Sequence, residues 1–165
     1  MSDYILGCVP LLNRSGHDAG RALLRELYRK HFREEMPEIS VSDRGKPYFA
    51  DKNIYFSISH TKRHAFCVLS SKEVGLDAEE LDRTVSPSLA QRILSPTELA
   101  QYEAAPDKDR ALLTFWVLKE AAAKATGEGL RGFPNHTDFS LNDPRVRELE
   151  GCLVAIIEKE QSHAV

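Results

Sequence analysis

The sequence has few cysteines, no excess of basic residues and no long hydrophobic run, and each shortage excludes a class of protein. Its three cysteines, Cys8, Cys67 and Cys152, lie far apart and in apolar stretches, so we expect buried reduced thiols rather than a disulfide or zinc framework. Such thiols favour a cytoplasmic location. The formal net charge of -3 gives no general attraction for nucleic acid or an anionic membrane. No run is long enough to span a membrane, and the N-terminus does not resemble a signal peptide.

A common nucleotide-binding glycine motif is missing as well. No Walker-type loop occurs in the 165 residues. The hydrophobic fraction of 42% and the charged fraction of 28% are ordinary for a globular protein. The length fits one compact domain, or two small halves that share a core.

Hydrophobic periodicity predicts alternating strands and helices. Strands are expected at 4–9, 54–60, 65–69, 74–79, 139–141 and 153–157. Helices are expected at 15–35, 86–94, from Ser95 onward, and from Asp107 to a stop at Gly127 and Gly129. This order predicts an α+β fold with two similar α/β halves, 1–72 and 73–165, that form a pseudo-dimer about a pseudo-twofold axis. Each half should have a small, mostly antiparallel sheet and a long helix.

The segment 115–130 is helical by composition, but one of its faces is mixed. At about 100° per residue, the residues Trp116, Lys119, Glu120, Ala123 and Lys124 share one side. That side suits either chemistry or an ordinary surface ion pair between Glu120 and Lys124.

Three carboxylates are candidates for a metal site. Asp77 and Glu79 project from one face of a predicted strand, and Glu120 lies on the mixed helix face. Ligands that are all oxygen suit a hard cation such as Mg²⁺, which commonly bridges to phosphate. A solvated strand face is the alternative for the pair on the strand. Candidate phosphate partners, each with an ordinary surface or hydrogen-bonding alternative, are Lys46, Ser59, His60, Lys119 and Lys124.

Four stretches, taken in order, resemble the 4′-phosphopantetheinyl transferases of the surfactin-synthetase-activating type. They are GKPY at 45–48, FSISH at 56–60, VGLDAE at 74–79 and WVLKEA at 116–121, the last followed by Lys124. The resemblance covers about 44–130. It implies a transferase-like pseudo-dimer fold and transfer of the 4′-phosphopantetheine arm of coenzyme A to a serine of an apo acyl or peptidyl carrier protein, with Mg²⁺ as cofactor and release of adenosine 3′,5′-bisphosphate.

The resemblance also implies residue roles. Asp77, Glu79 and Glu120 would bind the metal, and Glu120 and Lys124 would act in catalysis, Glu120 as the base for the serine hydroxyl. Contacts to coenzyme A would come from Lys46, Ser59, His60, Asp77, Lys119 and Lys124. Basic residues near the cleft, such as Lys62, Arg63 or Arg131, would suit an acidic carrier protein. A monomer would suffice, and neither nucleic acid nor membrane is expected as a partner.

Two departures and two alternatives accompany this interpretation. Alanine stands at Ala78, where larger aliphatic residues are usual, and fewer residues precede Lys46 than in longer members. The contacts to adenine are therefore not carried over. The alternatives are a non-catalytic module that binds coenzyme A or a carrier protein, and an unrelated Mg²⁺-dependent phosphotransferase.

Overall fold

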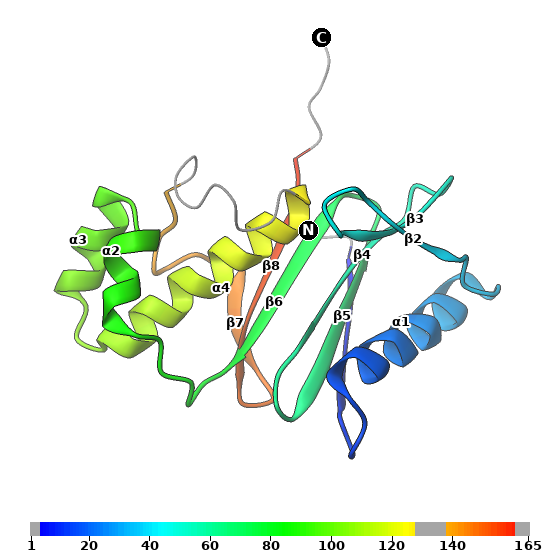
Figure 1. Ribbon diagram of the computed structural model, residues 1–165, viewed down its shortest axis with the longest axis horizontal. Coiled ribbons are helices and arrows are strands. Elements are labelled where there is room, and N and C mark those ends of the chain that lie inside the picture. The colour runs from blue at the N-terminus through cyan, green and yellow to red at the C-terminus, as the bar shows by residue number, and fades with distance from the viewer. Residues whose placement is uncertain (1–3, 128–137, 161–165) are drawn as a thin grey trace, which may run out of the picture.

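The computed structural model describes residues 4–127 and 138–160, and their fold is mixed α/β (Figure 1). Two three-stranded antiparallel sheets lie in the middle, with one long helix on the outer face of each. Within these residues, no helix has the length and apolar character needed to cross a membrane. Gly129 and Arg131, named above as a helix stop and a carrier contact, lie outside the described residues.

The first sheet has the strand order β1-β5-β4, with β1 at Ile5–Pro10, β4 at Tyr55–His60 and β5 at His64–Ser70. Helix α1 (Gly16–Phe32) packs on it through Leu24 and Tyr28, which share one buried cluster with Phe56 and Leu69. The hydroxyl of Ser15 accepts a hydrogen bond from the Asp18 N–H, which supplies the predicted start of this helix.

A small hairpin, not predicted as strands, sits beside the first sheet. It consists of β2 (Ile39–Val41) and β3 (Pro47–Phe49), and each strand is too short to show a hydrophobic period. The predicted turn between them is present. Gly45 has a φ of 88°, a conformation that favours glycine, and it brings Lys46 to the end of the turn.

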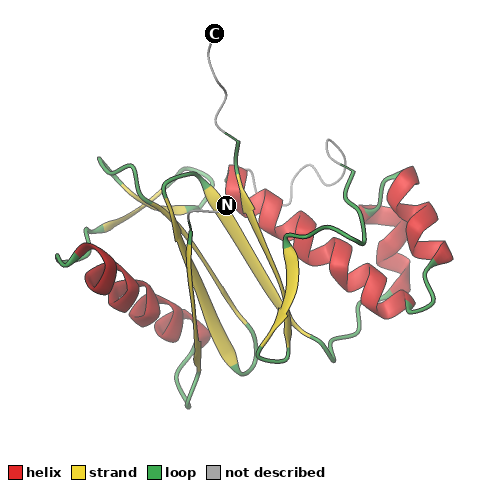
Figure 2. Ribbon diagram, turned by 180° about the vertical axis from the view of Figure 1, so that it is seen from behind, coloured by secondary structure: helices red, strands yellow, loops and turns green. Residues whose placement is uncertain are grey.

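The second sheet has the order β6-β8-β7, with β6 at Val74–Glu80, β7 at Val146–Leu149 and β8 at Cys152–Glu158. Helix α4 (Lys108–Thr126) covers its outer face, capped by Asp107 and ended by Gly127 at a φ of 73°. The short helices η1 (Pro87–Leu89), α2 (Ala90–Ile93) and α3 (Pro96–Ala104) gather at the far end of α4 (Figure 2). Ser95 and Glu98 form the predicted capping box.

Gly75 allows α4 to lie directly on β6. A Cβ at this position would be 1.8 Å from the carbonyl oxygen of Ala121, so only glycine fits. The close approach places the middle of α4 over the face of β6 that carries Asp77 and Glu79.

The inner faces of the two sheets pack against each other. Phe66 and Val68 of β5 lie with Leu76 and Ala78 of β6 in one buried cluster. Where β4 meets β6, serine hydroxyls take the place of a backbone ladder. Ser57 Oγ accepts from the Leu76 N–H at 3.0 Å, and Ser59 Oγ accepts from the Ala78 N–H at 3.1 Å.

The strand predicted at 139–141 is wrong. The Phe139 N–H donates to the Glu98 carboxylate at 2.9 Å, and the Leu141 N–H donates to Gln101 Oε1 at 3.1 Å. Side chains of α3 therefore satisfy this segment in place of a neighbouring strand. The strand that follows it, β7, was missed because its sequence VREL carries two charges and little periodicity.

Candidate active site

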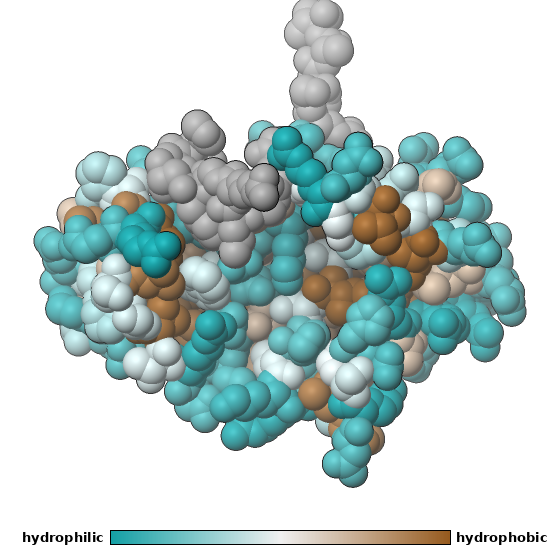
Figure 3. All heavy atoms as spheres, in the orientation of Figure 1, coloured by the Kyte–Doolittle hydropathy of each residue, from teal (hydrophilic) through white to brown (hydrophobic). Residues whose placement is uncertain are grey.

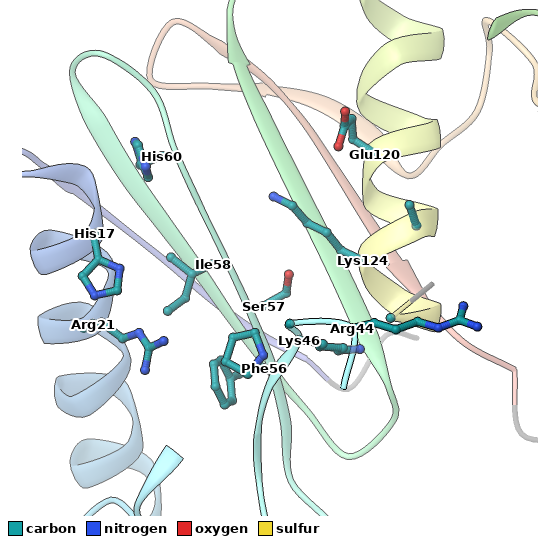
Figure 4. A pocket seen from close by; sticks show the side chains of 14 residues that line it. His17, Arg21, Arg44, Lys46, Phe56, Ser57, Ile58, His60, Glu120 and Lys124 are labelled. Carbon is teal, nitrogen blue, oxygen red and sulfur yellow. The ribbon is translucent and has the colours of Figure 1, made fainter. Parts of the chain in front are cut away.

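A cavity of about 370 Å³ lies between α1 and α4, over the outer face of β4. On the face of the molecule seen in Figure 3, hydrophobic residues lie near the middle, among hydrophilic neighbours. The residues whose side chains line it and carry charge or an imidazole are His17, Arg21, Arg44, Lys46, His60, Glu120 and Lys124 (Figure 4). Basic groups thus outnumber acidic ones around an apolar floor, which suits an anionic ligand with an apolar part.

One wall of the cavity is formed by residues that precede Lys72, on α1 and β4. His17 and Arg21 lie one turn apart on α1, and both project toward the cavity in Figure 4. His60 ends β4 against the start of α1, where a Cβ on Gly16 would be 2.1 Å from its Nδ1. The glycine therefore gives the imidazole its place beside the helix N-terminus.

Lys46 links the β2–β3 turn to the end of α4. Its Nζ donates to the carbonyl oxygen of Ala125 at 2.9 Å, and its stem lies against Gly127. A cation is favourable at the C-terminal end of a helix. Burial lowers the pKa of Lys46, while the charge of Glu73 opposes the shift. This residue joins segments on the two sides of the cavity.

Lys124 is held between α4 and β6. Its Nζ donates to the Leu76 carbonyl oxygen at 3.0 Å and lies 3.4 Å from Asp77 Oδ1. The side chain remains about one-third exposed and lines the cavity. Lys124 can therefore contact a ligand phosphate while it balances the charge of Asp77.

Asp77 is the most deeply buried of the three carboxylates, with 6% of its surface exposed. Burial raises its pKa to about 7; Lys124 opposes this shift, and the charges of Glu79 and Glu120 add to it. Its Oδ2 is buried and has no hydrogen-bond partner among the described residues. An orphaned carboxylate oxygen beside two further acids fits a hard cation such as Mg²⁺.

Glu79 and Glu120 complete the acidic group from opposite elements. Glu79 accepts a hydrogen bond from Trp116 Nε1 at 3.2 Å and pairs with Arg83. Burial raises the pKa of Glu120; Lys124 opposes this shift, and Glu79 adds to it. The three carboxylates act on one another electrostatically. Their oxygens, however, do not all lie within 4.8 Å of one another, as the ligands of one ion would. In the described part of the chain, the one group of three such side chains within 4.8 Å of each other is elsewhere.

Two residues predicted as ligand contacts face away from the cavity. Lys119 is 5% exposed, and its Nζ lies 2.7 Å from Glu98 Oε1 in a buried ion pair between α4 and α3. Ser59 is also buried, and its hydroxyl is bonded to β6. Of the predicted site residues, Lys46, His60, Glu120 and Lys124 line the cavity. Ser59, Lys119, Asp77 and Glu79 do not line it, although Asp77 is joined to it by the ion pair with Lys124.

The sequence interpretation missed three residues that line the cavity: His17, Arg21 and Arg44. The first two are four positions apart on a predicted helix, which is a signal for a shared face. Arg44 adjoins Lys46 in a predicted turn. Each pattern is common on solvated surfaces, so neither stands out without the fold.

Comparison with known proteins supports one family. The model of the 4′-phosphopantetheinyl transferase superfamily matches residues 73–164. The 4′-phosphopantetheinyl transferase HetI of Nostoc sp. is 32% identical over 128 residues, which is 72% of this chain and 54% of HetI. Sfp of Bacillus subtilis is 32% identical over 117 residues, or 67% and 51% of the two chains. AcpT of Escherichia coli is 35% identical over 114 residues, or 66% and 56%.

The chain matches only about half the length of these curated relatives. The family model, however, matches more than half of the chain and includes β6, α4 and all three carboxylates. This chain belongs to the 4′-phosphopantetheinyl transferase superfamily.

Proposed function

We propose that this chain transfers the 4′-phosphopantetheine arm of coenzyme A to a serine of an apo acyl or peptidyl carrier protein and releases adenosine 3′,5′-bisphosphate. The observation that carries the proposal is that His60 and Lys46 line one cavity together with Glu120 and Lys124. Two of these residues precede Lys72, and two belong to the region that the family model matches. The names of the relatives agree with this activity.

Coenzyme A would bind with its phosphates against the cationic rim. Lys46 and Lys124 both line the cavity beside the end of α4, and Arg21, Arg44 and His60 add further donors for phosphate oxygens. The apolar floor formed by Phe56 and Ile58 offers contact area for a part of the ligand that is not phosphate. In this proposal Ser59 and Lys119 have supporting roles, because they anchor β6 and α3.

The metal would be held by Asp77, Glu79 and Glu120. Mg²⁺, when bound, supplies positive charge against the oxygens of the pyrophosphate. The chain itself contributes Lys124, whose ammonium already lies at Asp77 and reaches the cavity. Its charge is in place before the reaction, so no reorganisation is needed as negative charge develops.

The reaction needs a base for the carrier serine. Glu120 lines the cavity, and burial raises its pKa from the ordinary value of 4.5, which makes it a better proton acceptor. Its carboxylate takes the hydroxyl proton as the serine oxygen bonds to the phosphorus that bears the pantetheine arm. The bond from that phosphorus to the bridging oxygen breaks, and the electron pair leaves with adenosine 3′,5′-bisphosphate.

We further infer that the residues 1–72 and 73–165 are two halves related by a pseudo-twofold axis. In support, each contains a strand, a long helix and then two further strands of one antiparallel sheet. In each sheet the last strand is central, as the orders β1-β5-β4 and β6-β8-β7 show. Since both walls of the cavity come from one chain, a monomer suffices for the proposed reaction. The cytoplasmic location is a separate prediction that rests on the cysteines.

A mass measurement tests the function. The chain is incubated with coenzyme A, Mg²⁺ and an apo carrier protein, and the intact carrier is weighed. We expect a gain equal to one phosphopantetheine arm, which disappears when Mg²⁺ is omitted or the acceptor serine is replaced by alanine. An unmodified carrier together with calorimetric binding of coenzyme A would show a binding module instead. Transfer to a different acceptor would indicate another phosphotransferase.

A further inference from the structure

A second cluster of side chains that could hold a metal ion lies between the two sheets, on the opposite face of β6 from Asp77 and Glu79. It consists of His64 at the start of β5, Glu80 at the end of β6 and Cys152 at the start of β8. One ligand atom from each lies within 4.8 Å of the other two. The β4–β5 and β7–β8 turns converge at this end of the molecule (Figure 1).

Two buried atoms in this cluster have no hydrogen-bond partner in the described chain: His64 Nδ1 and Glu80 Oε1. Glu80 is 7% exposed, and Arg63 pairs only with its other oxygen, at 3.2 Å. A buried polar atom without a partner costs roughly 1–3 kcal/mol, and native proteins contain few of them. Finding two within one group of metal-ligating residues points to a ligand that satisfies both.

The third member, Cys152, is fully buried, with weak contacts from its sulfur to Thr61 Oγ1 at 3.9 Å and to the Glu150 carbonyl oxygen at 3.8 Å. Its thiol also interacts with the Glu80 side chain, and burial together with the charge of Glu80 raises the pKa of the thiol to about 11 in the absence of an ion. A thiolate, an imidazole and a carboxylate together suit a borderline-soft ion such as Zn²⁺, whereas Mg²⁺ takes oxygen ligands almost alone. The two faces of β6 thus carry donor sets of different chemical hardness.

We propose that His64, Glu80 and Cys152 bind a Zn²⁺ ion that clasps the first sheet to the second. His64 belongs to the sheet of β5, and the other two belong to the sheet of β6 and β8. Since the unfolded chain does not hold these three residues together, ion binding stabilises the folded arrangement. The clasp is independent of the transfer reaction, because none of the three lines the cavity between α1 and α4.

The direct test is calorimetric titration of the reduced, chelator-treated full chain with Zn²⁺, with Mg²⁺ in excess to compete for the carboxylates on the opposite face. We expect one Zn²⁺ per chain and a higher melting temperature with the ion. His64→Gln and Cys152→Ala should each weaken binding by about 100-fold or more, since even the partners of a ligand are worth 10–100-fold. The matched controls, His31→Gln and Cys67→Ala, should bind as the unaltered chain does.

Co²⁺ provides a readout that identifies the sulfur ligand. The loaded chain should show a thiolate-to-metal charge-transfer band, which Cys152→Ala removes and Cys67→Ala retains. Circular dichroism of each metal-free variant confirms folding. If Cys152→Ala does not fold, the His64→Gln variant decides the outcome, because the His64 side chain is only half-buried. An unaltered chain that binds no Zn²⁺, or binding that both ligand variants leave unchanged, would overturn the proposal.

Discussion

The ammonium of Lys124 lies 3.4 Å from Oδ1 of Asp77, so one ion pair joins α4 to β6 at the wall of the cavity. Asp77 is buried and Lys124 is partly exposed, and the pair therefore connects the protein interior to the place where an anionic ligand would bind. The carboxylates Glu79 and Glu120 act on the same aspartate. Charge at this junction should therefore affect transfer, coenzyme A binding and the pH dependence of stability.

Glu120→Gln should keep the shape of the side chain and remove its charge. Loss of a base and of an electrostatic contribution costs about 10²-fold or more each, so we expect transfer to fall by several orders of magnitude. Intact-mass kinetics with a carrier protein would measure this, and a melting curve would establish that the variant is folded. Near-normal transfer by the folded variant would mean that Glu120 only forms an ordinary surface ion pair on the helix.

Lys124→Ala should act largely through affinity for coenzyme A. A hydrogen bond to a charged group is worth about 1.5–3 kcal/mol, so the dissociation constant should rise by roughly 10- to 100-fold. Calorimetry with coenzyme A measures the effect, and Lys30→Ala, an exposed lysine on α1, is the control. The idea fails if the two variants bind coenzyme A equally well.

Lys119→Met should destabilise the fold without weakening coenzyme A binding. The substitution leaves Glu98 buried and unpaired, which costs about 3–5 kcal/mol in comparable pairs. Glu98 also holds the Ser95 and Phe139 N–H groups, so the damage should spread to the start of α3. Urea unfolding and calorimetry separate the two effects. A stable variant with weak coenzyme A binding would restore the phosphate-contact role predicted from the sequence.

Asp77 should make the metal-free protein less stable as pH rises. Its pKa is about 7 in the folded protein against an ordinary value of 3.8, so between these values the folded state holds a proton that the unfolded state has released. Stability from this group is complete below 3.8 and is lost as the pH rises through 7.

Asp77→Asn removes that titration. Above pH 7 the metal-free variant should be more stable than the unaltered chain, and below pH 3.8 the difference should vanish. The variant should also lose any rise in melting temperature that Mg²⁺ produces. Urea unfolding across the pH range checks the sign, and a variant that is less stable at every pH would contradict it.

Local signals account for most of the elements predicted correctly. Ser15, Ser95 and Asp107 cap three of the four predicted helices because capping depends on a hydrogen bond to an N–H only three residues away. Strand β6 follows from alternation over the six residues 74–79. The segment around Phe139 failed because its backbone partners lie on α3, about forty residues earlier in the chain.

For the site, spacing alone placed Glu120 and Lys124 on one face of a helix, and both line the cavity. The same spacing placed Lys119 beside them, although a neighbour one position away points in a different direction around a helix. Its direction became decisive only when α3 packed against α4 and offered Glu98 as a buried partner.

The sequence by itself determined the helix caps, the alternation of the main strands and the ordered motifs that mark the family, since each depends on residues close together in the chain. Only the tertiary structure decided what meets across the sheets: Lys46 with the Ala125 carbonyl, and His64 with Glu80 and Cys152. No spacing rule links such residues, because their distance depends on how α4 and β8 pack rather than on the number of residues between them.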